Sequence, residues 1–216
     1  MTRLGSVRKE VSPMPIALPR VDLDLIESWV PQGARVLDLG CGDGAFLARL
    51  KKTRNVSGYG VEIDDTNVQR CIAHGVNVIQ QDLEAGLAMF EDHAFDVVIL
   101  SQTLQAMHNT ERILKEIARV GNEGIVSFPN FGYWYHVWSI ARGRMPVSKQ
   151  MPYEWYNTPN IHLCTVNDFE ALISKIGHRI VGKQLFLRGH TVRFLGALRS
   201  TLAVYRFEPK RVHGAV

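Results

Sequence analysis

A glycine-rich turn directly after an apolar run constrains this 216-residue chain more than any other feature. Residues 36–44 read VLDLGCGDG, and a helical pattern of apolar residues begins at Phe46. A buried strand that ends in such a turn and opens a helix is typical of open α/β sheets, where glycines let the backbone approach a nucleotide closely. The sequence therefore predicts a nucleotide pocket at this turn.

Strand-like and helix-like patterns alternate from Arg35 onward, which indicates a mostly parallel sheet covered by helices on both faces. Buried parallel strands are nearly continuous apolar runs. Seven segments have this character, namely residues 35–40, 56–63, 77–82, 95–101, 123–129, 179–187 and 201–207. The expected fold class is α/β, a single Rossmann-like domain with a seven-stranded, mostly parallel sheet.

Amphipathic segments between these strands predict the helices. They lie around residues 23–29, after Gly44, at 113–120 and at 166–176. The first ends before Pro31, because the residue before a proline resists helical geometry. Asn109 is the predicted N-cap of the third.

The chain divides into a domain and two tails. Residues 1–20 contain several prolines and no apolar stretch, so we expect a disordered leader there, and 210–216 form a short basic tail. The domain spans 21–209. Within it, residues 131–161 form an aromatic-rich insertion after the fifth strand, expected to cap the pocket mouth. Trp134 and Trp138 share one face of a short helix in it, and packing of that face into the core is an equal alternative.

Charge, cysteines and hydropathy exclude several classes. The net charge of +4 lies in the tails and leaves −1 for residues 21–209, whereas a nucleic-acid binder concentrates basic charge on its folded surface. No apolar run is long enough to span a bilayer. The three cysteines lack CxxC spacing, so neither a disulfide framework nor a metal site is predicted. We therefore expect a cytoplasmic protein without nucleic-acid or membrane partners.

Three acids at successive strand ends distinguish two candidate ligands, NAD and S-adenosylmethionine (SAM). Residues 40–45, GCGDGA, match the dinucleotide fingerprint, and Glu62 stands where a carboxylate accepts the ribose hydroxyls of either ligand. Asp38 lies inside the motif, which suits the cationic groups of SAM and disfavours a pyrophosphate. Asp82 can receive the adenine amine while the Leu83 amide reaches a ring nitrogen. The combination favours SAM, although each acid alone is also explained as a cap or a strand end.

The predicted cofactor site draws on the ends of four strands. Its residues are Asp38, Gly40, Cys41, Gly42, Gly44, Glu62, Ile63, Asp82, Leu83 and Ser101. Cys41 is interpreted as a small packing residue rather than as a reactive thiol.

No catalytic residue can be assigned from the sequence. His108, His136 and His162 lie in segments that can roof the pocket, and each is either a general base or, more commonly, a hydrogen-bonded structural residue. Methyl transfer needs mainly positioning of the reactants, so the missing base does not decide whether the protein is an enzyme.

The motifs VLDLGCGDG (36–44), YGVEID (59–64) and QQDL (80–83) resemble those of class I SAM-dependent methyltransferases. The resemblance implies that Asp38 and the glycine turn hold the methionine end of SAM. It also implies that Glu62 binds the ribose and that Asp82 and Leu83 bind the adenine. The stretches FDVVILSQTLQ (95–105), GIVSFPNFG (124–132) and MPYEWYNTPNIHLC (151–164) are similar to the MetW family of methionine biosynthesis. This likeness covers about residues 21–207.

The MetW resemblance implies a partner, homoserine O-acyltransferase (MetX), whose activity such proteins are thought to support. Two functions of different classes follow. One is a SAM-binding regulatory partner of the acyltransferase, and the other is an active methyltransferase acting on a small molecule. A fold alone does not choose between them. An NAD-binding protein is a third and more remote alternative.

Overall fold

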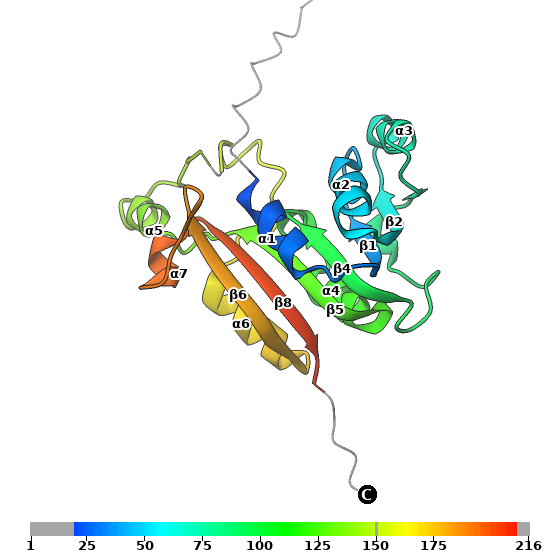
Figure 1. Ribbon diagram of the computed structural model, residues 1–216. Helices are drawn as coiled ribbons and strands as arrows, with labels where there is room; N and C mark the ends of the chain where they lie inside the picture. Colours follow the sequence, from blue (N-terminus) through cyan, green and yellow to red (C-terminus); the bar gives the residue numbers. More distant parts are fainter. Residues whose placement is uncertain (1–19, 150, 211–216) are drawn as a thin grey trace, which may run out of the picture.

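An eight-stranded sheet forms the centre of the protein and carries helices on both faces (Figure 1). The structure, a computed structural model, describes residues 20–149 and 151–210. Residues 1–19 of the predicted leader and 211–216 of the predicted tail lie outside this description. Along the sheet the strands are ordered β3-β2-β1-β4-β5-β8-β6-β7.

The strands confirm the α/β prediction with one addition. Their bounds are β1 Arg35–Leu39, β2 Ser57–Glu62, β3 Val78–Gln80, β4 Phe95–Ser101, β5 Gly121–Pro129, β6 His178–Leu187, β7 His190–Thr191 and β8 Leu202–Pro209. The first five run parallel, and β8 lies antiparallel between β5 and β6. The predicted count of seven is one short, because β7 has two residues and thus no apolar pattern to find.

The helices divide between the two faces of the sheet. They are α1 Val21–Trp29, α2 Ala45–Arg54, α3 Asp65–Ala73, α4 Thr110–Val120, α5 Trp134–Ala141, α6 Val166–Lys175 and α7 Gly196–Arg199, with 3-10 turns η1 Leu83–Ala85 and η2 Leu104–Ala106. Buried side chains of α1, α2 and α3 form one core with the sheet, and those of α4 and α6 form the other. Neighbours in β1, Val36 and Leu37, belong to opposite cores, as expected for a strand buried on both faces. None of the helices in residues 20–149 and 151–210 is long and apolar enough to cross a membrane.

Asn109 precedes α4 as predicted, but the expected capping bond is absent. Its side-chain amide donates instead to the Glu84 carboxylate, 3.0 Å away, and makes no bond to the first turn of α4. The N-cap position is as predicted, but η1 brings a charged acceptor within reach of the side chain, and a hydrogen bond to a carboxylate is stronger than one between neutral groups.

The aromatic insertion contains the predicted helix, α5, with its aromatic face turned outward. Trp134 and Trp138 are each about half exposed, at 53% and 51%, whereas His136 is 1% exposed. The alternative that this face completes the core is therefore wrong. After α5 the chain runs back to the sheet, where the amides of Ile161 and His162 both donate to the Gln105 carbonyl in η2.

The buried side chain of Asn130 joins the start of the insertion to the rest of the domain. Its amide nitrogen donates to the carbonyls of Ala197 (2.7 Å) and Ser200 (2.9 Å). Its oxygen accepts from the amides of Gly132 (3.0 Å) and Val166 (3.3 Å). The starts of α5 and α6 are thus fixed relative to α7.

We predict that Asn130→Ala lowers the free energy of unfolding by roughly 2–4 kcal/mol, because it leaves several buried backbone groups without partners. Urea denaturation followed by circular dichroism measures this loss. Asn122→Ala, at an exposed position in β5, is the control and should change stability by less than about 0.5 kcal/mol. Equal losses in the two variants would contradict the anchoring role.

Candidate functional site

The glycine turn between β1 and α2 has the backbone geometry that its sequence requires. Gly40, Gly42 and Gly44 have φ angles of +68°, +57° and +74°, a region that other residues rarely adopt. A Cβ atom on Gly40 would lie 2.8 Å from the Thr103 hydroxyl oxygen, and one on Gly44 would lie 2.8 Å from the sulfur of Cys71. Two of the three positions therefore exclude larger residues by space as well as by conformation.

Asp38 lies in β1 immediately before this turn and is 3% exposed. No residue that the structure describes donates a hydrogen bond to its carboxylate. Burial raises the pKa of Asp38 to about 7, Arg20 opposes the rise, and the Glu62 carboxylate adds to it. A buried carboxyl group without a partner is costly, so this position is suited to a cationic ligand group.

Glu62, at the end of β2, supports the turn from the side. One carboxylate oxygen accepts from the Gly42 amide at 2.8 Å. The other accepts from the amides of Ile63 (2.9 Å) and Asp64 (3.0 Å). The side chain is 9% exposed. Glu62 therefore stabilises the turn in addition to any contact with a ligand.

The predicted adenine residues lie at the next strand end. Asp82 is exposed, and one of its carboxylate oxygens accepts from the Glu84 amide at 2.9 Å, which caps η1. Leu83 is buried at 8% exposure. Ile63 presents an exposed apolar side chain after β2. The structure thus leaves one oxygen of Asp82 without a described partner.

Ser101, at the end of β4, belongs to a buried polar network around Asp22 of α1. Its hydroxyl donates to Asp22 at 3.1 Å and receives a bond of 2.6 Å from the Arg20 guanidinium. Asp22 is fully buried and also accepts from the side chains of Ser127 (2.9 Å) and Gln102 (3.2 Å). Ser101 therefore positions neighbouring side chains at the carboxyl ends of the parallel strands.

Arg20 is the functional candidate that sequence reasoning missed, because it fell within the predicted leader. Its guanidinium pairs with Asp22 through two bonds of 3.0 Å and is near enough to Asp38 to oppose the rise of that pKa. One signal was available, since Asp22 shares the inward face of α1 with Ile26, and an acid there needs a cationic partner.

Cys41 packs against a second thiol rather than facing the pocket. Its sulfur lies 3.7 Å from that of Cys71, and both side chains are buried. Burial raises the pKa of the Cys41 thiol above its ordinary value. This geometry agrees with a packing role.

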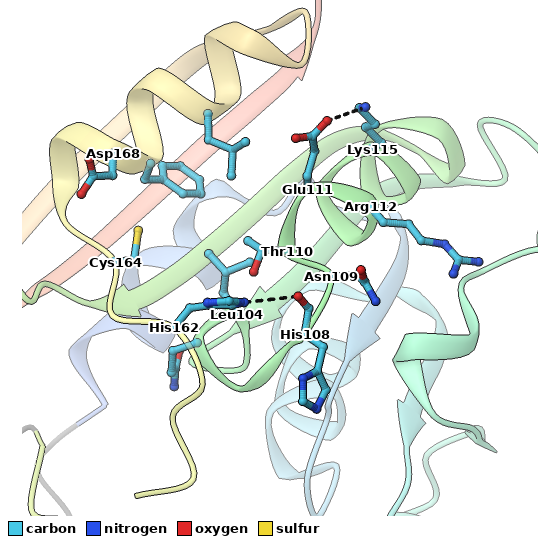
Figure 2. Close-up of a pocket in the computed structure, with 13 residues that line it drawn as sticks. Leu104, His108, Asn109, Thr110, Glu111, Arg112, Lys115, His162, Cys164 and Asp168 are labelled. Atoms are coloured by element: carbon cyan, nitrogen blue, oxygen red, sulfur yellow. Dashed lines mark hydrogen bonds and ion pairs between the residues drawn. The ribbon is translucent and has the colours of Figure 1, made fainter. Parts of the chain in front are cut away.

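A separate cavity of about 700 Å³ lies between α4 and the segment that leads into α6, and we call it the α4–α6 cavity (Figure 2). Arg112 and Lys115 of α4 stand on one side, with Cys164 and Asp168 on the other. None of the ten predicted cofactor residues lines it. The η2 segment separates it from the glycine turn, since Thr103 contacts Gly40 while Leu104 lines the cavity.

The structure brings two of the three histidines together and leaves His136 apart. His108 and His162 line the α4–α6 cavity, where a ring nitrogen of His162 is 3.2 Å from the His108 carbonyl. His136 lies on the buried face of α5, where its Nε2 atom is 3.0 Å from the Ser148 hydroxyl oxygen. Burial lowers the pKa of His136. These contacts give the rings of His162 and His136 structural partners.

The profile of a family described as "Methionine biosynthesis protein MetW" matches residues 20–207. The chain belongs to the MetW family. It is 36% identical over 176 residues to a protein of Rhodopirellula baltica described as bifunctional methionine biosynthesis protein MetXA/MetW. That match covers 77% of this chain but 28% of the relative, so a MetW sequence corresponds to one part of a longer fused protein.

Solved structures show that this MetW protein has the methyltransferase fold. A SAM-dependent methyltransferase from Mesorhizobium loti superposes with a TM-score of 0.67 at 15% identity, covering 88% of this chain and 98% of that one. A possible histamine N-methyltransferase from Thermotoga maritima gives 0.62 at 20% identity, covering 88% of each chain. The [4+2]-cyclase SpnF gives 0.60 at 16% identity, covering 87% of this chain and 79% of that one, which illustrates that one fold hosts different chemistry.

We predict that Asp38→Asn stabilises the ligand-free protein at pH 8 but not at pH 4. In an unfolded chain the carboxyl titrates near 3.8, whereas in the folded protein its pKa is about 7. The folded state therefore loses stability as pH rises from about 4 to 7, and the loss is complete above that range. The variant should raise the unfolding midpoint by about 5 °C at pH 8. Thermal melts at both pH values measure this, and equal shifts would contradict ionisation as the cause.

Proposed function

We propose that this MetW-family protein binds SAM at the glycine turn and, in the bound state, supports homoserine O-acyltransferase. The observation that carries the first part is the buried Asp38 carboxylate beside that turn, which has no hydrogen-bond donor among the residues that the structure describes. The observation that carries the second part is the fused relative. A cytoplasmic location belongs to the same proposal.

The methionine end of SAM is a zwitterion and needs one group of each charge. Asp38 supplies the negative group for the ammonium. Arg20 supplies the positive group for the carboxylate, because Asp22 and Ser101 hold its guanidinium close to Asp38. An arginine fixed on one edge can still offer donors to a carboxylate, since guanidinium has five N–H groups.

The ribose and adenine residues follow from the neighbouring strand ends. An ionised carboxylate has about four lone-pair positions, and three backbone amides already occupy Glu62. Glu62 therefore accepts one ribose hydroxyl in this arrangement rather than two. Ile63 covers one face of the adenine, while Asp82 and the Leu83 amide bind its edge.

Support of homoserine O-acyltransferase is favoured over methyl transfer by the Rhodopirellula baltica relative, whose description joins MetXA and MetW in one chain. Joining two proteins in one chain raises their effective concentration for each other, which is useful where they act together. Methyl transfer to a small molecule remains the alternative. It would need an acceptor beside the sulfonium, whereas the α4–α6 cavity lies beyond η2.

We predict that Arg20→Gln weakens SAM binding at least tenfold, because charge-assisted hydrogen bonds contribute about 1.5–3 kcal/mol. Decarboxylated SAM, which lacks the carboxylate, should bind the parent and the variant equally. Calorimetry with both ligands measures this, with a parent dissociation constant on the order of micromolar. Arg49→Gln, which removes an exposed arginine of α2, is the control. Equal weakening for both ligands would contradict the assigned role of Arg20.

We predict that the protein raises the activity of homoserine O-acyltransferase when both are mixed at micromolar concentration. The effect should increase when SAM is added and should be absent with Asp38→Asn. Acyl transfer and methyl transfer are assayed in the same mixture. An unchanged acyltransferase would exclude the supporting role, and a SAM-dependent methylated product would establish the methyltransferase alternative.

A further inference from the structure

Helix α5 exposes almost all of its apolar side chains. Trp134, Tyr135, Val137, Trp138 and Ile140 are each more than two-fifths exposed. In an ordinary surface helix the apolar face packs inward. Here the inward residue is His136, so the aromatic side chains face solvent although the helix is firmly attached.

The chain before α7 extends this apolar area. Phe194, Leu195 and Leu198 are 69%, 54% and 46% exposed. The carbonyl of Ala197 in α7 lies within 3.2 Å of where a Cβ atom on Gly132 would stand, so α7 adjoins the start of α5. Figure 1 shows the two helices together at one end of the sheet. We call the exposed apolar residues of α5 and 194–198 the aromatic surface.

Basic residues are frequent in the two segments that form the aromatic surface. Segments 131–149 and 186–200 contain six arginines and lysines and no acid, although residues 21–209 as a whole carry −1. The Arg142 guanidinium lies over the Trp138 ring, 4.6 Å from its centre. Among residues 20–149 and 151–210, Arg144, Arg193 and Arg199 form no ion pair. Because α7 adjoins the start of α5, the fold brings Arg199, at the end of α7, to the same part of the molecule as Arg142, which follows α5.

We propose that the aromatic surface with its basic rim is the docking site for an acidic-rimmed face of homoserine O-acyltransferase. This assignment rests on the proposed function, in which that enzyme is the partner. Tryptophan, tyrosine and arginine are the side chains that most often dominate protein interfaces. Apolar anchors inside a charged rim also match the ordinary anatomy of an interface.

A protein occupant explains the site better than a membrane or a nucleic acid. The aromatic side chains come from two segments held rigidly by Asn130, as expected of a preformed interface. A nucleic-acid site would be expected to form a broader basic surface, yet the rest of residues 21–209 carries net negative charge. The fused relative supplies the identity of the protein.

The test measures affinity of the full chain for purified homoserine O-acyltransferase by biolayer interferometry. Trp134→Ala/Trp138→Ala should weaken binding about thirtyfold or more. Arg144→Glu/Arg199→Glu should weaken it and remove most of its dependence on salt. The matched control is Ile72→Ala/Met89→Ala, which truncates two exposed apolar residues away from the aromatic surface and should change affinity less than threefold. SAM affinity should be the same for all variants.

The outcomes separate this assignment from the proposed function. If the parent binds the acyltransferase and the tryptophan variant binds equally well, the surface assignment is wrong while the partnership stands. If the parent does not bind the enzyme, both are wrong. Co-sedimentation with phosphatidylglycerol vesicles and gel shifts with RNA complete the test. Tryptophan-dependent binding to either, without an effect on the enzyme, would overturn the protein assignment.

Discussion

The ionised carboxylate of Asp22 organises the carboxyl ends of the strands, where the candidate site lies. Burial by itself would raise the pKa of this group, but hydrogen bonds and charge from Arg20, with bonds from Ser127 and Gln102, hold the pKa below its ordinary value. A buried charge is tolerated when it is paired and fully hydrogen-bonded. Through it, α1 is fixed to the ends of β4 and β5, and the Arg20 guanidinium keeps its place.

The sequence predicted the fold well because the fold depends on local patterns. Strands such as β1 and β4 are buried on both faces and appear as unbroken apolar runs. The geometry of the glycine turn is likewise predictable, because it depends on glycines that are close together in the sequence. The short β7 could not be predicted, because two residues carry no apolar pattern. The hydrogen bond of the Asn109 side chain could not be predicted either, because its acceptor, Glu84, lies 25 residues away in the sequence.

The acids of the candidate site were predictable from the sequence, but its cation was not. Asp38 and Glu62 belong to a motif, whereas the proposed role of Arg20 depends on a contact with Ser101, 81 residues later. Partners of Asp22 lie up to 105 residues away. Such pairings follow from the strand order, which one sequence does not reveal. The same reason hides the basic rim, since α7 meets the start of α5 only in the folded protein.

The return of the insertion to η2 joins two distant parts of the molecule in one series of hydrogen bonds. The amides of Ile161 and His162 bind the Gln105 carbonyl, the Gln105 side chain donates to the Gln102 carbonyl, and the Gln102 side chain donates to Asp22. If a protein seated on α5 fixes the insertion, this series transmits the change toward the glycine turn. Thermodynamic linkage then requires reciprocity, in which nucleotide and protein change each other's affinity by the same factor. The cell's supply of one would thereby set the occupancy of the other.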